Sequence, residues 1–226
     1  MRMSSAFDKG AAMVTRDFYM RDVNAVAPEL LGKLLVHETP EGIVSGLIVE
    51  VESYAGPHDK GAHSYGNRQT ERTKIQYGAG GFAYIFTIYG MYDCFNVVVN
   101  MPTKPEAILV RALEPVDGIE LMKRRRKTEN LISLCNGPGK LCGALGITKE
   151  QYGYDLCGSS LFIKPYEDVP EEQIMVSPRI NIDYAEECKD YLWRYFIKEN
   201  PHVSKVAKKY REKYMSYEML KLKDQN

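Results

Sequence analysis

The sequence predicts a single-domain, mixed α/β (α+β) fold in which helices flank a largely antiparallel, curved β-sheet that carries a protruding β-hairpin. The chain has 226 residues, a length that suits one large domain. Runs of β-branched and aromatic residues gather in the middle of the chain, whereas helical spacing is found toward its two ends. No internal repeat, low-complexity segment or long linker divides the sequence, so we expect one domain.

The first half of the chain is expected to form one helix followed by strands. Apolar residues at helical spacing predict a helix over residues 17–35, with Pro28 near the helix start. Residues 43–54 alternate between polar and apolar side chains, as a strand does. Their β-branched and aromatic content predicts three further strands, the first two joined as a hairpin, over residues 83–89, 92–99 and 107–113.

The second half is expected to contain two short helices, a loop, a strand and a helical tail. Asp117 should cap a short helix that runs into the basic residues 123–127, and Pro138 should begin another helix. A loop follows residue 165, and a strand is expected near residues 191–197. From about residue 202 we expect a basic helical tail.

The composition excludes several classes of protein. Hydrophobic residues make up 44% of the chain and charged residues 27%, as in globular proteins. Thirty basic against thirty acidic residues give a net charge of zero, which excludes binding to nucleic acid or membrane by bulk charge alone but permits a local basic patch. The first dozen residues contain no apolar signal segment, and glycines interrupt the uncharged stretch 75–92, so no membrane association is expected. Five cysteines without a Cys-x-x-Cys pair argue for a reducing, cytoplasmic location.

Glu50, Glu52 and Tyr54 are expected to share one face of their strand, with Val49 and Val51 on the other face. One interpretation is an edge strand whose acidic face lies in water. The other is a carboxylate held over a cleft as a general base, with Tyr54 as a wall of that cleft. The pattern alone leaves both interpretations open.

A turn-rich loop follows at residues 56–64, and such loops often carry functional residues. His58, Asp59 and His63 could together bind a metal ion. Alternatively, His63 lies at the surface or fixes the loop by a hydrogen bond. We expect no metal.

Basic residues offer candidate phosphate contacts at several places. Arg68 and Arg72 lie four residues apart and either bind phosphates or form a solvated charged surface. The same alternatives hold for the basic runs at residues 123–127 and 205–213. Residues 137–140 (Gly-Pro-Gly-Lys) lack P-loop spacing but could offer helix N-terminal amides to a phosphate.

The expected hairpin tip is unusual because it carries the large side chains of Tyr89, Met91 and Tyr92, where a turn favours Asn, Asp or Gly. Either the tip packs under another element, or it is a wedge between stacked bases, as in minor-groove proteins. Asn96 and Arg111 each interrupt an apolar strand and are either satisfied core residues or part of a site.

Five short motifs occur in the order in which one family carries them, and together they are specific although each alone is weak. With them the sequence resembles the alkyladenine (3-methyladenine, or methylpurine) DNA glycosylase family over about residues 15–200; the motifs are VEVESYAGP at 49–57, AHS at 62–64, IYGMY at 88–92, RALEP at 111–115 and GPGKLC at 137–142. The resemblance implies a glycosylase domain over residues 15–200, between a flexible N-terminus (1–14) and a basic tail (201–226).

The resemblance implies a monofunctional base-excision repair enzyme that flips alkylated or deaminated purines out of double-stranded DNA and hydrolyses the N-glycosidic bond, leaving an abasic site. Its implied substrates are 3-methyladenine, 7-methylguanine, hypoxanthine and ethenoadenine. It implies no metal and no cofactor. We expect a monomer, associated with the nucleoid if the source is bacterial. A different class also stays open, namely a non-catalytic module that binds damaged DNA with the same tip and arginines.

Roles for individual residues follow from the same resemblance. Glu52 matches the family's general base, and Arg111 and the carbonyl of Ile180 match groups that hold the attacking water. Four residues match the base pocket: Tyr54, His63, Phe86 (a tyrosine in the best-known members) and Asn96, which reads the purine edge and disfavours the amino group of guanine. Six residues are assigned to DNA binding, with the hairpin tip as the intercalating element: Tyr89, Met91, Tyr92, Arg68, Thr70 and Lys140. Asn181 departs from the glycine that is usual there.

Overall fold

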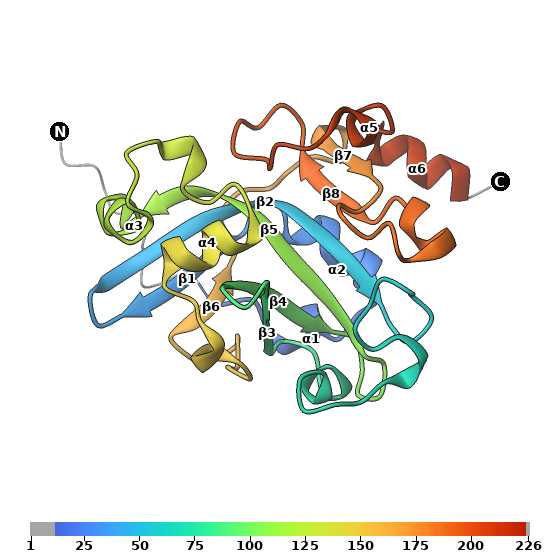
Figure 1. Ribbon diagram of the computed structural model, residues 1–226, viewed down its shortest axis with the longest axis horizontal. Coiled ribbons are helices and arrows are strands. Elements are labelled where there is room, and N and C mark those ends of the chain that lie inside the picture. The colour runs from blue at the N-terminus through green and yellow to red at the C-terminus, as the bar shows by residue number, and fades with distance from the viewer. Residues whose placement is uncertain (1–11, 225–226) are drawn as a thin grey trace.

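Antiparallel strands form one curved sheet at the centre of the molecule (Figure 1). The computed structural model describes residues 12–224, and within that range nine strands pair in the order β3-β4-β5-β2-β8-β7-β9, with β1 on β2 and β6 on β1. This confirms the predicted single-domain, mixed α/β fold. The strands are β1 (Leu34–Thr39), β2 (Gly42–Ala55), β3 (Ala83–Ile88), β4 (Tyr92–Val99), β5 (Glu106–Asp117), β6 (Leu161–Lys164), β7 (Ile174–Ser177), β8 (Arg194–Ile197) and β9 (Met215–Ser216).

Strand β2 is the longest strand and pairs along both of its edges. Over residues 45–55 one edge pairs with β5. The other edge pairs first with β1, over residues 42–47, and then with β8, over residues 50–52. The change of neighbour coincides with a β-bulge around Glu50, where the register with β5 shifts twice. The acidic part of β2 is therefore inside the sheet, and the interpretation of an edge strand in water is wrong.

The bulge also overturns the expectation that Val49 and Val51 share a face. Val51 packs in the main apolar core with Ile48, whereas Val49 packs in a second cluster with Leu47. A bulge inserts one extra residue into a strand, so it reverses the alternation of side chains from that point on.

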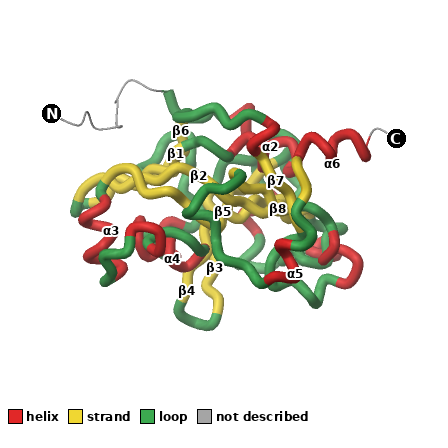
Figure 2. The backbone as a smooth tube through the Cα atoms, turned by 90° about the horizontal axis from the view of Figure 1, so that it is seen from above, coloured by secondary structure: helices red, strands yellow, loops and turns green. Residues whose placement is uncertain are grey.

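Helices cover the sheet and complete the core. Within residues 12–224 they are α1 (Arg16–Tyr19), α2 (Val23–Leu30), α3 (Ile119–Arg126), α4 (Pro138–Leu145), α5 (Lys208–Arg211) and α6 (Tyr217–Asp224). α2 packs against β2 and α4 against β4, and the main cluster combines side chains such as Leu30, Phe95 and Leu141. The β3–β4 hairpin projects from this body (Figure 2). No helix of the described range is long and apolar enough to cross a membrane.

The single helix expected over residues 17–35 is wrong, because the chain divides it into α1 and α2 and then enters β1. The side chain of Asp22 accepts a hydrogen bond from the Asn24 N–H at 2.9 Å and so caps α2. Pro28 lies in the last turn of α2 and not near its start. Leu34, which contributed to the helical spacing, is buried in β1.

Two further expectations fail near the later helices. Asp117 does not cap α3; it ends β5 and accepts a hydrogen bond from the Ser45 hydroxyl at 2.7 Å, while Gly118, with φ of 72°, is the N-cap. The tail is not helical from residue 202, because α5 begins only at Lys208 and β9 separates it from α6.

Other expectations are confirmed. The hairpin and the helix that begins at Pro138 form as predicted, and the strand near 191–197 forms in shorter form as β8. For residues 1–11, the expected flexible N-terminus lies outside the described residues.

The close approach of Gly80 to α1 gives a test of the packing. A Cβ added at Gly80 would lie 2.4 Å from the carbonyl oxygen of Tyr19, whereas one added at the exposed Gly158 would meet nothing within 4 Å. We expect Gly80→Ala to lower the free energy of unfolding by about 2 kcal/mol, because backbone must move to admit the methyl group. Gly158→Ala is the matched control and should leave denaturant unfolding nearly unchanged; equal behaviour of the two variants would contradict the packing.

Candidate active site

The carboxylate of Glu52 lies at the centre of a buried polar cluster. Its Oε2 accepts hydrogen bonds from the Tyr54 hydroxyl at 2.9 Å and from Nη1 of Arg111 at 3.3 Å. Its Oε1 accepts one from the backbone N–H of Ile180 at 2.8 Å. The Glu52 side chain is fully buried, so these three donors take the place of water around the charge. The sequence-predicted residues Glu52, Tyr54, Arg111 and Ile180 are thus brought together.

Glu50 supplies a second buried carboxylate on the other side of Arg111. Its Oε1 accepts hydrogen bonds from Nε of Arg111 at 3.1 Å and from Nε of Arg194 at 2.7 Å. Burial by itself would raise the pKa of Glu50, but the charges of Arg194 and Arg111 outweigh it and lower the pKa. Arg111 stays protonated for the converse reason: burial opposes its charge, and Glu52 and Glu50 raise its pKa. Two carboxylates and two guanidinium groups therefore balance within the fold.

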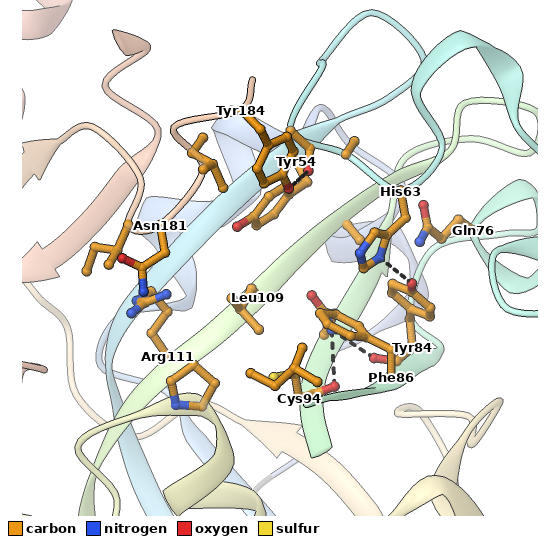
Figure 3. A pocket seen from close by; sticks show the side chains of 18 of the residues that line it. Tyr54, His63, Gln76, Tyr84, Phe86, Cys94, Leu109, Arg111, Asn181 and Tyr184 are labelled. Carbon is orange, nitrogen blue, oxygen red and sulfur yellow. Dashed lines mark hydrogen bonds between the residues drawn. The ribbon is translucent and has the colours of Figure 1, made fainter. Parts of the chain in front are cut away.

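A cavity of about 280 Å³ opens beside this cluster. Its size is close to the lower limit, roughly 300 Å³, of pockets that bind small molecules. Figure 3 shows Tyr54 and Tyr184 on one side of it, Phe86 and Tyr84 on another, and Arg111 with Asn181 at a third. Glu52 does not line the cavity itself, but its three hydrogen-bond donors do.

His63 lines the cavity as a neutral ring. Its Nδ1 lies 2.7 Å from the hydroxyl of Tyr84, and its ring packs edge-on against Phe86 with 4.6 Å between centroids (Figure 3). Burial, and then the positive charges of Arg72 and Arg68, lower the pKa of His63 to about 4. At neutral pH the ring therefore carries one N–H and one acceptor nitrogen, and it adds no charge to the cavity.

Asn96 is held rigidly in the wall of the cavity. Its Nδ2 donates to the backbone carbonyls of Tyr84 at 3.1 Å and of Cys94 at 3.2 Å. The side chain is almost completely buried. With both amide hydrogens engaged, the side chain presents a fixed shape and its carbonyl oxygen to its surroundings.

An ion pair beneath Tyr54 supports the loop that follows β2. Asp59 and Arg179 are both fully buried, with 2.7 Å between Oδ1 and Nη2. Arg179 also donates to the carbonyl of Ser53, and its guanidinium lies 4.7 Å from the centroid of the Tyr54 ring. This pair ties the strand end to the segment that carries Ile180.

Tyr89 and Met91 at the tip of the hairpin are exposed, whereas the ring of Tyr92 lies beside Gly139 of α4. Tyr89 is 82% exposed and Met91 69%, and Tyr92 is about half exposed. Tyr89 and Gly90 both have positive φ, of 51° and 70°, and the N–H of Met91 donates to the carbonyl of Ile88. This is the two-residue turn geometry that holds a hairpin tight, so the exposed side chains stand on a fixed support.

The basic candidates lie around the mouth of the cavity. A second hollow, which shares His63 and Tyr184 with the cavity, is lined by Arg68, Thr70 and Arg72. Pro138 also lines the cavity, and Lys140 follows in the same turn of α4, where its ammonium donates to the Asn136 side chain.

The three residues considered as metal ligands are not arranged as a metal site. Asp59 pairs with Arg179 and His63 pairs with Tyr84. No group of three or more His, Cys, Asp or Glu side chains in residues 12–224 is arranged to hold a metal ion.

Sequence reasoning missed several residues of the cavity, namely Gln76, Tyr84, Cys94, Leu109 and Tyr184. A signal existed for Tyr84, because it lies two residues before Phe86 and so shares its strand face. Tyr184 had no such signal, since it lies in an irregular segment far along the chain from β2.

Comparison with known proteins finds one matching family and several similar proteins. The family described as "Methylpurine-DNA glycosylase (MPG)" matches residues 17–201. A protein of Clostridium novyi is 49% identical over 200 residues, which cover 85% of this chain and 98% of that protein. One from Clostridium acetobutylicum is 50% identical (85% and 98% covered), and one from Bacillus mycoides 51% identical (83% and 97% covered). All three carry the name "Putative 3-methyladenine DNA glycosylase".

The neutral state of His63 can be measured directly. We expect a nitrogen NMR titration of its imidazole to give a midpoint near pH 4. Because this folded-state pKa lies below the usual 6.5, the unfolded chain takes up the proton first. The contribution of His63 therefore makes the free energy of unfolding fall as the pH drops from 6.5 toward 4. His63→Gln should remove that contribution, and a midpoint at or above 6.5 would contradict the buried geometry.

Proposed function

The chain belongs to the methylpurine-DNA glycosylase family, and from this premise we propose that Glu52 is the general base that activates a water for hydrolysis of the N-glycosidic bond. As a DNA glycosylase, the protein is a hydrolase of N-glycosyl bonds that binds damaged DNA. We propose 3-methyladenine and 7-methylguanine as its main substrates, with hypoxanthine and ethenoadenine as further candidates.

The observation that carries this mechanism is the set of three donors on Glu52. Hydrogen bonds from Tyr54, Arg111 and the Ile180 N–H fix the orientation of the Glu52 carboxylate, the group proposed to accept a proton from water. In the proposed step the water oxygen attacks C1′ of the nucleotide and its proton passes to Glu52. The electron pair of the glycosidic bond leaves with the base. Arg111 and the Ile180 carbonyl are proposed to position that water.

The pocket chemistry suits an electron-poor base that has been flipped out of the duplex. Tyr54 and Phe86 offer aromatic faces to the cavity, and such faces attract a ring that carries positive charge, as an alkylated purine does. The neutral His63 does not repel that charge. The rigid Asn96 is proposed to read the purine edge, since its side chain cannot turn away from a base with an additional amino group.

Exposed residues around the cavity mouth are proposed to hold the DNA. Tyr89, with Met91 and Tyr92, would fill the gap that the flipped nucleotide leaves in the stack, which offsets part of the cost of flipping. We propose that three side chains contact phosphates of the DNA backbone: the basic Arg68 and Lys140, and the hydroxyl of Thr70.

A water nucleophile implies a monofunctional enzyme. A lyase reaction needs an amine that forms a Schiff base, and no lysine is among the described residues that line the cavity. We propose that residues 15–200 form the glycosylase domain and that it acts as a monomer without a cofactor.

The first test replaces the proposed base. In single-turnover release of 3-methyladenine from methylated duplex DNA, with EDTA present throughout, Glu52→Gln should be at least about a hundredfold slower than wild type, because the amide accepts no proton from water. DNA affinity should be retained. Glu38→Gln, an exposed residue of β1, is the matched control and should release the base at the wild-type rate.

Three outcomes would contradict the proposed mechanism. If Glu52→Gln releases the base at the wild-type rate, Glu52 is not the base. If wild type binds methylated DNA but releases no base, the chain is a binding module. Loss of wild-type activity in EDTA alone would indicate a metal-dependent reaction.

The second test concerns the hairpin tip. Tyr89→Ser should slow single-turnover base release by about tenfold, because a stacked aromatic ring no longer holds the opened duplex. Its thermal unfolding should match that of wild type, since the side chain is 82% exposed. Tyr166→Ser, at another exposed tyrosine, controls for the loss of a surface ring. Equal rates for the two variants would rule out a role for Tyr89 in holding DNA.

A further inference from the structure

Residues 202–216, here called the C-terminal segment, lie beyond residue 201, where the family match ends. The relatives named above are matched over 97–98% of their own lengths but over only 83–85% of this chain. Part of this chain therefore lies outside these matches. The C-terminal segment nevertheless reaches the cluster around Glu52 at two points.

The first point is Ser204, which binds Glu50 through two groups. Its backbone N–H donates to Oε2 of Glu50 at 2.7 Å, and its hydroxyl donates to Oε1 at 2.8 Å. Both hydrogen bonds are buried. Glu50 therefore accepts from three elements, since Arg111 of β5 and Arg194 of β8 bind Oε1 as well.

The second point is Tyr210, which binds the segment next to Ile180. Its hydroxyl accepts a hydrogen bond from the backbone N–H of Asn181 at 3.0 Å, and its side chain is 7% exposed. Asn181 has φ of 60°, a left-handed conformation that needs support in a non-glycine residue. The preceding residue, Ile180, donates its N–H to Glu52.

Further contacts hold the C-terminal segment in place. The ring of Tyr214 packs against Phe196 of β8 with 4.7 Å between centroids, and the Arg194 guanidinium lies within 5.6 Å of the same ring. Lys213 pairs with Asp190 at 2.7 Å on the surface. In Figure 1 the red chain that contains α5 runs beside β7 and β8.

We propose that the C-terminal segment is a positioning element of the active site: Ser204 holds Glu50 and Tyr210 holds the backbone at Asn181, so that Arg111 and the Ile180 N–H stay fixed on Glu52. The proposal rests on the proposed role of Glu52 as general base. Neither Ser204 nor Tyr210 lines the cavity, so both act through other residues.

The physical reason is that Ser204 and Arg111 donate hydrogen bonds to the same carboxylate, that of Glu50. Arg111 divides its hydrogen bonds between Glu50 and Glu52, so its position depends on where the Glu50 carboxylate is held. Without the Ser204 hydroxyl, the Glu50 carboxylate loses one hydrogen bond and can rotate about the terminal bonds of its side chain. We expect Arg111 to move with the carboxylate, because it donates to the same oxygen. Displacements of about 1 Å in such supporting groups can slow catalysis up to a hundredfold.

The test compares four variants in single-turnover release of 3-methyladenine from methylated duplex DNA. Ser204→Ala and Tyr210→Phe should each slow release by about tenfold, with DNA affinity within twofold of wild type. Ser204→Thr retains the hydroxyl and should restore the rate. Lys208→Ala, an 82% exposed residue of the same segment, should behave as wild type. Amide hydrogen exchange at Ile180, followed by NMR, should be faster in Ser204→Ala and in Tyr210→Phe but not in Lys208→Ala.

Three results would overturn the proposal. The first is a wild-type rate in both Ser204→Ala and Tyr210→Phe. The second is a slow Ser204→Thr variant, which would exclude the hydroxyl as the cause. The third is a loss of DNA affinity and thermal stability in parallel with the rate, which would indicate a purely structural role.

Failure of the proposed function would look different. In that case wild type itself releases no base, and the kinetic comparison does not apply. The exchange of the Ile180 amide still decides the positioning role, because it reports the hydrogen bond to Glu52 without any reaction. Unchanged exchange in both variants would then exclude that role.

Discussion

The rest of the structure depends on the placement of Arg111 between two buried carboxylates. Glu50 and Glu52 lie on the same strand and are both fully buried, so their charges are tolerable only with cations in contact. One cation comes from β5 and the other, Arg194, from β8, on opposite edges of β2. The acidic strand must therefore lie inside the sheet, and the change of neighbour from β1 to β8 at Glu50 is what brings Arg194 alongside.

The site has two parts, a buried polar cluster around Glu52 and an exposed hairpin tip. The groups around Glu52 are buried and hydrogen-bonded, as a base that must be oriented before the reaction requires. The hairpin tip exposes the aromatic side chain of Tyr89 to water, which is unfavourable in the free protein. Such exposure is reasonable only if a partner covers the side chain. A fixed carboxylate, proposed as the base, and an exposed aromatic side chain, proposed as the wedge, lie on a strand and a hairpin of the same sheet, as the proposed removal of the substrate from the base stack requires.

Local patterns predicted the parts of the site that lie within single strands. The hairpin with Tyr89 at its tip is a property of a few consecutive residues and is confirmed in the structure. The expected shared face of Glu50, Glu52 and Tyr54 agrees with the hydrogen bonds that join Tyr54 to Glu52 and Arg111 to both carboxylates. The bulge that moves Val49 into a second cluster was not predictable, because it arises from pairing with two different strands. The short strands β6, β7 and β9 carry too few residues for a periodic signal, and the leucines of β1 gave a helical one.

The partners of the buried polar groups could not be predicted from the sequence. Asp59 was considered as a metal ligand because His58 and His63 lie in the same loop, yet its partner is Arg179, 120 residues away. Ser204 likewise meets Glu50 across 154 residues. Nothing in the residues next to Asp59 or Ser204 indicates these partners, since a buried polar group is satisfied by whatever the fold brings to it. Motifs therefore identified the groups proposed to touch the substrate, whereas the groups that hold them in position became visible only once the distant segments were packed together.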